Sequence, residues 1–126
     1  YPLFIQDAEG EEAIASMPGC ARLGPSALLS EIELSMAAGI QSFVLFPATP
    51  EHLKTPGGEE AFRPDGLVQT SLRTIKKQFP ECTLVTDVAL DPYSTEGHDG
   101  LVSPEGTILN DEKVHWYWYI PSLCVY

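Results

Sequence analysis

Three short, almost continuously apolar segments alternate along this chain with two segments of helical periodicity. The apolar segments are residues 1–5, 40–46 and 83–90, and their β-branched and aromatic residues are typical of strands covered on both faces. Alternation of this kind predicts an α/β fold with parallel strands joined by right-handed crossovers. Two architectures fit, an open doubly wound sheet and part of a (β/α)8 barrel.

The expected helices are delimited by residues that favour helix ends. Pro25 suits the first turn of the first helix, and Gly39 follows its last turn. The second helix is expected over residues 67–79 and ends before Pro80. A third helix is expected to begin at residues 110–112, where Asn is followed by two acids.

The connections that leave the predicted strands are long for this class of fold. Residues 6–24 and 47–66 both exceed the about two to six residues of usual βα connections. Both leave the carboxyl ends of strands, where parallel α/β folds place their functional residues. The third connection, residues 91–106, is expected to take part in a short hairpin between Leu101 and Ile108.

Three strands would leave two unpaired sheet edges, so we expect the sequence to be part of a larger sheet. Tyr1 opens directly into an apolar segment without an initiator Met or a basic leader, and we interpret this beginning as processed or cut. The longest apolar runs, such as residues 43–46, are far shorter than a membrane-spanning segment.

The composition fits one globular domain and argues against several partners. The chain has 126 residues, 44% of them hydrophobic, which is enough for one modest core. Its net charge of −11 argues against nucleic acid and acidic membranes, because phosphates are bound by a basic patch. Cys20, Cys82 and Cys124 lack the spacing of a metal site, and we expect reduced thiols in a chain that is not secreted.

Acidic residues are concentrated in residues 87–100. Asp87 is expected inside an apolar strand, where a carboxylate is costly unless it is paired, hydrogen-bonded or close to a metal. Together with Asp91, Glu96 and Asp99 it could offer oxygen ligands to a hard cation such as Mg²⁺. A solvated acidic loop explains the same residues and stays open. His98, the one His near these acids, is more often a structural residue than a ligand.

Other catalytic chemistries lack support in the sequence. No glycine-rich nucleotide-binding motif follows a predicted strand, and no Ser or Cys lies in a nucleophile elbow. A lysine that forms a Schiff base needs a desolvated site that lowers its pKa. The lysines are instead expected in loops or at exposed helix positions: Lys54, Lys76, Lys77 and Lys113.

In order and spacing, several segments resemble the first part of the 5-aminolevulinate dehydratase (porphobilinogen synthase) family. They are YPLFI at 1–5, SMPG at 16–19 followed by Arg22, GIQSFVLFP at 39–47, PDGLVQ at 64–69, TDVALDPYSTEGHDG at 86–100 and LND at 109–111. The resemblance covers residues 1–114. Residues 115–126, with an aromatic run from Trp116 to Tyr119, diverge and are not expected to be family sequence.

The resemblance implies a fold and an activity. The family is a TIM barrel that condenses two 5-aminolevulinate molecules into porphobilinogen, a step of tetrapyrrole and heme biosynthesis, and usually assembles as a homo-octamer. This chain would contribute the first three βα units. The family's two Schiff-base lysines lie on later barrel strands, so none of the lysines here is given that role and the chain alone is expected to be inactive.

The resemblance also implies a type of metal site. Zinc-dependent members carry three cysteines in the acidic segment, and the corresponding positions here are Ala89, Asp91 and Asp99. The chain is therefore similar to the zinc-free, Mg²⁺-responsive subgroup, since oxygen ligands favour Mg²⁺ over Zn²⁺. Asp87 matches an active-site aspartate of the family. This subgroup implies a plastid or a bacterial cytoplasm.

Two further hypotheses stay open. In one, the chain is a non-catalytic interaction or regulatory fragment that pairs with full-length subunits through open sheet edges and its aromatic run. In the other, Asp87, Asp91 and Asp99 bind Mg²⁺ without catalysis.

Overall fold

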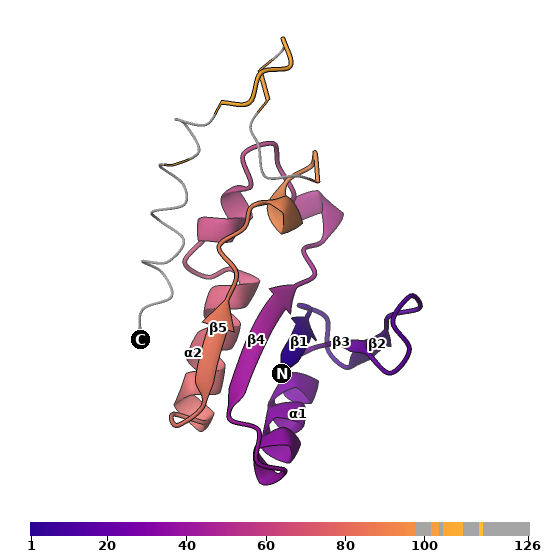
Figure 1. Cartoon of the computed structure of the whole chain (residues 1–126), viewed down its shortest axis with the longest axis vertical. Helices are drawn as coiled ribbons and strands as arrows, with labels where there is room; N and C mark the ends of the chain where they lie inside the picture. Colours follow the sequence, from indigo (N-terminus) through magenta and orange to yellow (C-terminus); the bar gives the residue numbers. More distant parts are fainter. Residues whose placement is uncertain (98–101, 104, 110–113, 115–126) are drawn as a thin grey trace.

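The computed structural model describes residues 1–97, 102–103, 105–109 and 114. Within them, one sheet has five strands in the order β2-β3-β1-β4-β5 (Figure 1). Neighbouring strands are parallel, except that β2 runs antiparallel to β3. The fold is α/β with a mostly parallel sheet, as predicted for part of a TIM barrel. The strands are β1 (Pro2–Ile5), β2 (Glu11–Ala13), β3 (Ala21–Leu23), β4 (Ser42–Pro47) and β5 (Thr83–Thr86).

Two helices, α1 (Pro25–Ala37) and α2 (Leu67–Gln78), pack on one face of this sheet (Figure 1). Alternate residues of β1 and β4 point to this face, and Ile5 and Phe43 are fully buried there. The helices contribute apolar residues at helical spacing. The shared core consists of Leu3, Ile5, Leu23, Leu28, Ile32, Phe43, Leu45, Val68, Leu72, Ile75 and Cys82.

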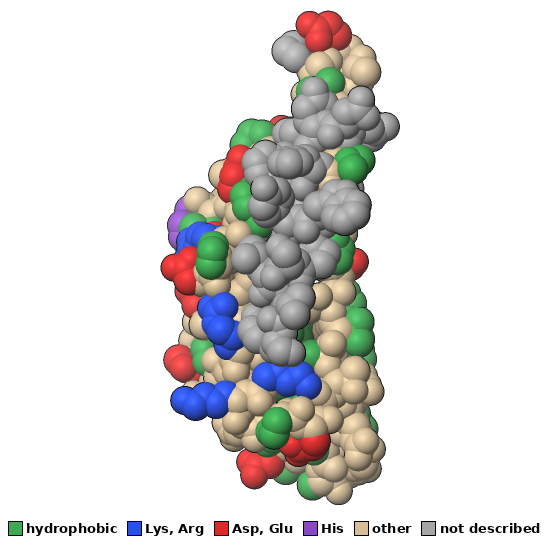
Figure 2. Space-filling view, turned by 90° about the vertical axis from the view of Figure 1, so that its left-hand side faces the viewer, with side chains coloured by type: hydrophobic (Ala, Val, Ile, Leu, Met, Phe, Trp, Pro, Cys, Tyr) green, Lys and Arg blue, Asp and Glu red, His purple; other side chains and the backbone are tan. Residues whose placement is uncertain are grey.

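The ends of both helices agree closely with the sequence prediction. Pro25 takes the first position of α1, and Gly39 follows the helix with φ of 94°, a conformation that side chains disfavour. After α2, the Lys76 ammonium group donates hydrogen bonds to the carbonyl oxygens of Pro80 and Cys82, which ties the following turn to the helix. Figure 2 looks onto the side that carries α2, where basic and acidic side chains are interspersed.

Two predictions about the strands were wrong. Residues 6–24 are not a single loop, because they contain the short strands β2 and β3, and β1 is therefore not a sheet edge. The strand predicted over residues 83–90 ends at Thr86, whose partner in β4 is Leu45. Pro47 lies two residues beyond Leu45 in β4. Because proline has no backbone N–H, it cannot donate the next hydrogen bond between β4 and β5, and the pairing of the two strands stops.

The predicted hairpin is present in the part of the chain that the structure describes. Val102 and Ile108 form an antiparallel bridge, and the Ser103 amide donates a hydrogen bond of 2.9 Å to the carbonyl oxygen of Thr107. Leu101, where the hairpin was predicted to begin, lies outside the described residues. The helix start predicted at residues 110–112 and the divergent residues 115–126 also lie outside them.

The described cysteines, Cys20 and Cys82, are both free thiols, as the sequence predicted; Cys124 lies outside the described residues. Over the described ranges, neither α1 nor α2 has the length and apolar character needed to cross a membrane, and no other helix does.

Candidate functional site

The candidate site lies where the parallel strands end. Because β1, β4 and β5 run in the same direction, the segments that follow them emerge at one edge of the sheet. We call residues 48–66 the β4 loop and residues 87–97 the β5 loop, and Figure 1 shows both above this edge. The loops contain short 3₁₀ helices, namely η1 (Glu51–Leu53), η2 (Glu59–Phe62) and η3 (Asp91–Tyr93).

Backbone hydrogen bonds join the two loops. The Thr55 amide donates to the carbonyl oxygen of Tyr93 at 3.1 Å, and the Thr95 amide donates to the carbonyl oxygen of Thr55 at 3.1 Å. These bonds form an isolated parallel bridge between Thr55 and Ser94. Pairing between the β4 and β5 segments therefore resumes beyond the ends of the two strands.

A small apolar cluster lies between the same loops. Ala61 of η2 packs with Leu90 and Tyr93 of the β5 loop, and these three residues are 1%, 1% and 9% exposed. Gly58 adopts φ of 68°, and a Cβ atom there would lie 3.4 Å from the Leu90 side chain. The positive φ favours glycine at this position, whereas the contact with Leu90 is an ordinary van der Waals distance. The cluster thereby fixes Leu90, the residue directly before Asp91.

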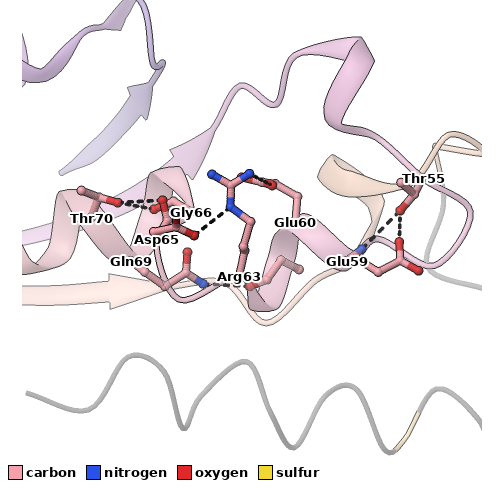
Figure 3. Close-up of polar contacts among 9 residues, drawn as sticks. Thr55, Glu59, Glu60, Arg63, Asp65, Gly66, Gln69 and Thr70 are labelled. Atoms are coloured by element: carbon pink, nitrogen blue, oxygen red, sulfur yellow. Dashed lines mark hydrogen bonds and ion pairs between the residues drawn. The ribbon is translucent and has the colours of Figure 1, made fainter.

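Polar side chains connect the β4 loop to α2 (Figure 3). The Arg63 guanidinium bridges the carboxylates of Glu60 and Asp65, with N–O distances of 3.0 and 2.9 Å. The Gln69 side chain, on a residue only 2% exposed, donates a hydrogen bond of 2.8 Å to the carbonyl oxygen of Ala61. The first turn of α2 is therefore linked directly to the apolar cluster.

Two of the three predicted site carboxylates lie in the described part of the β5 segment. Asp87 directly follows β5 and Asp91 begins η3, and both residues are exposed. The buried environment predicted for Asp87 was wrong, because β5 ends before it. Asp99 and His98 lie outside the described residues. Among those described, no three His, Cys, Asp or Glu residues are grouped so that they could hold a metal ion, and the Mg²⁺ site stays a prediction.

The described lysines make structural contacts or are exposed. Lys54 forms an ion pair of 2.5 Å with Glu51, and Lys76 binds the carbonyl groups that follow α2. Lys77 is exposed, and Lys113 lies outside the described residues. None of the three described lysines is buried, whereas a Schiff-base lysine requires a desolvated site.

Sequence reasoning missed the contacts that hold the loops together. One signal was available, since Gln69 stands three residues before the buried Leu72 and thus on the core-facing side of α2. Sequence reasoning also missed a groove with a volume of about 240 Å³, which lies between the helices and the β4 loop. Leu28 of α1, Thr70 of α2 and Tyr93 are among the residues that line it.

Comparisons with known proteins agree on one family. The family model described as delta-aminolevulinic acid dehydratase matches residues 1–122. The chain is 52% identical over 116 residues to the chloroplastic delta-aminolevulinic acid dehydratase of Pisum sativum, which covers 91% of this chain and 29% of the pea protein. The corresponding protein of Selaginella martensii is 50% identical over 115 residues, covering 90% of this chain and 28% of its own.

A solved structure shows the same likeness in three dimensions. It is the Toxoplasma gondii delta-aminolevulinic acid dehydratase (porphobilinogen synthase) in complex with the reaction product porphobilinogen. The TM-score is 0.94 at 42% sequence identity, and the match covers 98% of this chain and 36% of that one. The chain thus spans about a third of the solved protein, and the shared part includes both loops described above.

Proposed function

Because the chain belongs to the delta-aminolevulinic acid dehydratase family, we propose that it contributes to a barrel that condenses two 5-aminolevulinate molecules into porphobilinogen. The observation that carries this proposal is the TM-score of 0.94 to a family member solved with that product. The chain corresponds to 36% of that member, so the activity is proposed for a whole barrel of which these residues form a part.

The chain by itself is not expected to form porphobilinogen. The reaction needs lysines that form Schiff bases with the substrate, and Lys54 and Lys76 are engaged in other contacts. The purified chain, incubated with 5-aminolevulinate and Mg²⁺, should give no porphobilinogen in a colorimetric assay. Borohydride should trap no substrate on any of its lysines. The full-length pea enzyme is the positive control, and turnover or a trapped adduct on the chain would contradict this expectation.

In the whole barrel, Asp87, Asp91 and Asp99 are proposed to belong to a Mg²⁺ site that takes no zinc. The donor set supports this, because carboxylate oxygens suit Mg²⁺ whereas zinc sites favour thiolate and imidazole. The exposure of Asp87 and Asp91 on the β5 loop leaves them accessible to a cation. Ala89 stands at the first cysteine position of zinc-dependent members, and its side chain offers no ligand atom.

Calorimetric titration of the chain with Mg²⁺ and Zn²⁺ tests this site. The double substitution Asp91→Ala, Asp99→Ala should weaken Mg²⁺ binding. The matched control is Glu33→Ala, Glu81→Ala, which removes the same charge from exposed positions elsewhere. Equal Mg²⁺ affinity of the two double variants would reject the loop as the site.

An alternative function is non-catalytic pairing with full-length subunits. The observation in its favour is that β5 is the last strand of the described sheet, with Val85 46% exposed. Co-purification of the chain with tagged full-length pea enzyme tests it, and Val85→Lys should weaken the capture. A chain that stays monomeric and leaves the enzyme's activity unchanged rules this function out.

The plastid is the proposed compartment. Support comes from the names of the relatives, since the Pisum sativum and Arabidopsis thaliana proteins are both described as chloroplastic. Immunoblots of isolated organelles from the source cells, probed with an antibody to this chain, should give a signal in the plastid fraction. A signal confined to the cytosolic fraction would reject the assignment.

A further inference from the structure

Gln69 has a buried polar side chain, and the function proposed above gives it no part. It is 2% exposed, on the face of α2 that packs toward the β4 loop. We propose that Gln69 is a positioning residue that holds the β4 loop and, through it, the β5 loop that carries Asp87 and Asp91. This inference rests on the proposed function of the β5 loop and adds to it a residue from the second helix.

The first link is the contact between Gln69 and η2. Its Nε2 donates to the carbonyl oxygen of Ala61 at 2.8 Å. On the other side the amide packs closely on Gly66, where an added Cβ atom would lie 2.7 Å from the Gln69 Oε1. The side chain therefore fills a space bounded by the backbone of the β4 loop and of the helix start. A buried carbonyl that loses its donor is costly, so this bond restrains η2.

The second link runs from η2 to the β5 loop. Ala61 packs against Leu90 and Tyr93, all of them buried. The backbone bonds between Thr55 and the segment around Ser94 hold the same two loops a few residues away. Displacement of η2 would thus loosen the loop on both sides of η3, where Asp91 is placed.

Amide hydrogen exchange on the 126-residue chain, followed by NMR, tests the proposal. The informative amides are those of Thr55 and Thr95, which bond across the loops, and the reference amide is that of Val44, which donates to Tyr1 within the sheet. Gln69→Met keeps the length of the side chain but removes the donor. Gln78→Met makes the same exchange at an exposed position of the same helix and is the matched control.

Gln69→Met should lower the protection of the Thr55 and Thr95 amides by about tenfold or more, with Val44 unchanged, because the loss is local. The control should leave all three amides as in the wild type. Unchanged protection at Thr55 and Thr95 in Gln69→Met would overturn the proposal, and so would an equal loss at Val44, which would indicate general destabilisation.

Gln69→Glu is a second variant, and the pH dependence of its amide protection would not change if Gln69 acted through packing alone. Its carboxylate cannot donate to Ala61, whereas the protonated acid can. Protection of Thr95 relative to the wild type should therefore be low at neutral pH and recover as the pH falls through the pKa of the carboxyl group. Absence of that recovery would count against the proposal. None of these measurements depends on porphobilinogen formation, so failure of the proposed function would be seen separately, in the enzyme assay.

Discussion

Cys82 is enclosed where the chain enters β5. It is 1% exposed within the core, and desolvation raises the pKa of its thiol. Cys20 is only half-buried. The thiolate is the reactive form of cysteine, so the two thiols should differ in reactivity while the chain is folded.

We expect iodoacetamide at mildly alkaline pH to alkylate Cys20 well before Cys82. The unfolded chain ionises Cys82 at a lower pH than the folded chain does. The stability that comes from keeping this thiol neutral is therefore present below its ordinary pKa and is lost as the pH rises through the raised value. Mass spectrometry of peptides after timed labelling measures both rates. Equal alkylation rates for the two thiols in the folded chain would contradict the burial of Cys82 in the core.

Asp87 shows how far single residues could be interpreted from the sequence. Its membership of an acidic segment near the end of a strand was predicted, and its position directly after β5, at the carboxyl edge of the sheet, agrees with that. Its burial was predicted wrongly, because the apolar residues Val88 and Leu90 were taken as a continuation of the strand. In the structure Val88 is 40% exposed, and Leu90 is buried by the β4 loop rather than by the sheet core.

At the scale of elements, marked ends made the helices predictable. Pro25 and Gly39 delimit α1, and Pro80 stands just beyond α2. The strands β2 and β3 escaped prediction, because three residues are too few to establish an alternating pattern. All three residues of β2 are exposed, so hydrophobicity gave no signal there.

The packing of α2 leads to a stability prediction. Leu72 is 3% exposed in the shared core, and Leu34 on α1 is 69% exposed. Leu72→Ala should lower the free energy of unfolding by about 2–5 kcal/mol, because it leaves a cavity. The same substitution at Leu34 should change it by about 0.5 kcal/mol or less. Urea titrations of both variants and the wild type provide the comparison. Equal unfolding midpoints for the two variants would contradict the assignment of Leu72 to the core and of Leu34 to the exposed surface.

At the scale of the molecule, the sheet is continuous from β2 to β5, and its two helices lie on one face. The parallel strands β1, β4 and β5 were predictable from the alternation of elements, which left an open doubly wound sheet and part of a barrel both possible. The choice of a barrel came from the family resemblance. The arrangement of the site was less accessible. Thr55 and Tyr93 are joined by a hydrogen bond between backbone atoms, and the type of side chain at either position does not predict such a bond.

The most direct test of the account is a chimeric enzyme. Residues 1–109 of this chain would replace the matching segment of the pea dehydratase, and porphobilinogen formation from 5-aminolevulinate would be measured. If these residues form a working part of the family's barrel, the chimera should make porphobilinogen at a rate comparable with that of the pea enzyme. A chimera that folds and assembles like the pea enzyme but forms no product would contradict the proposed function.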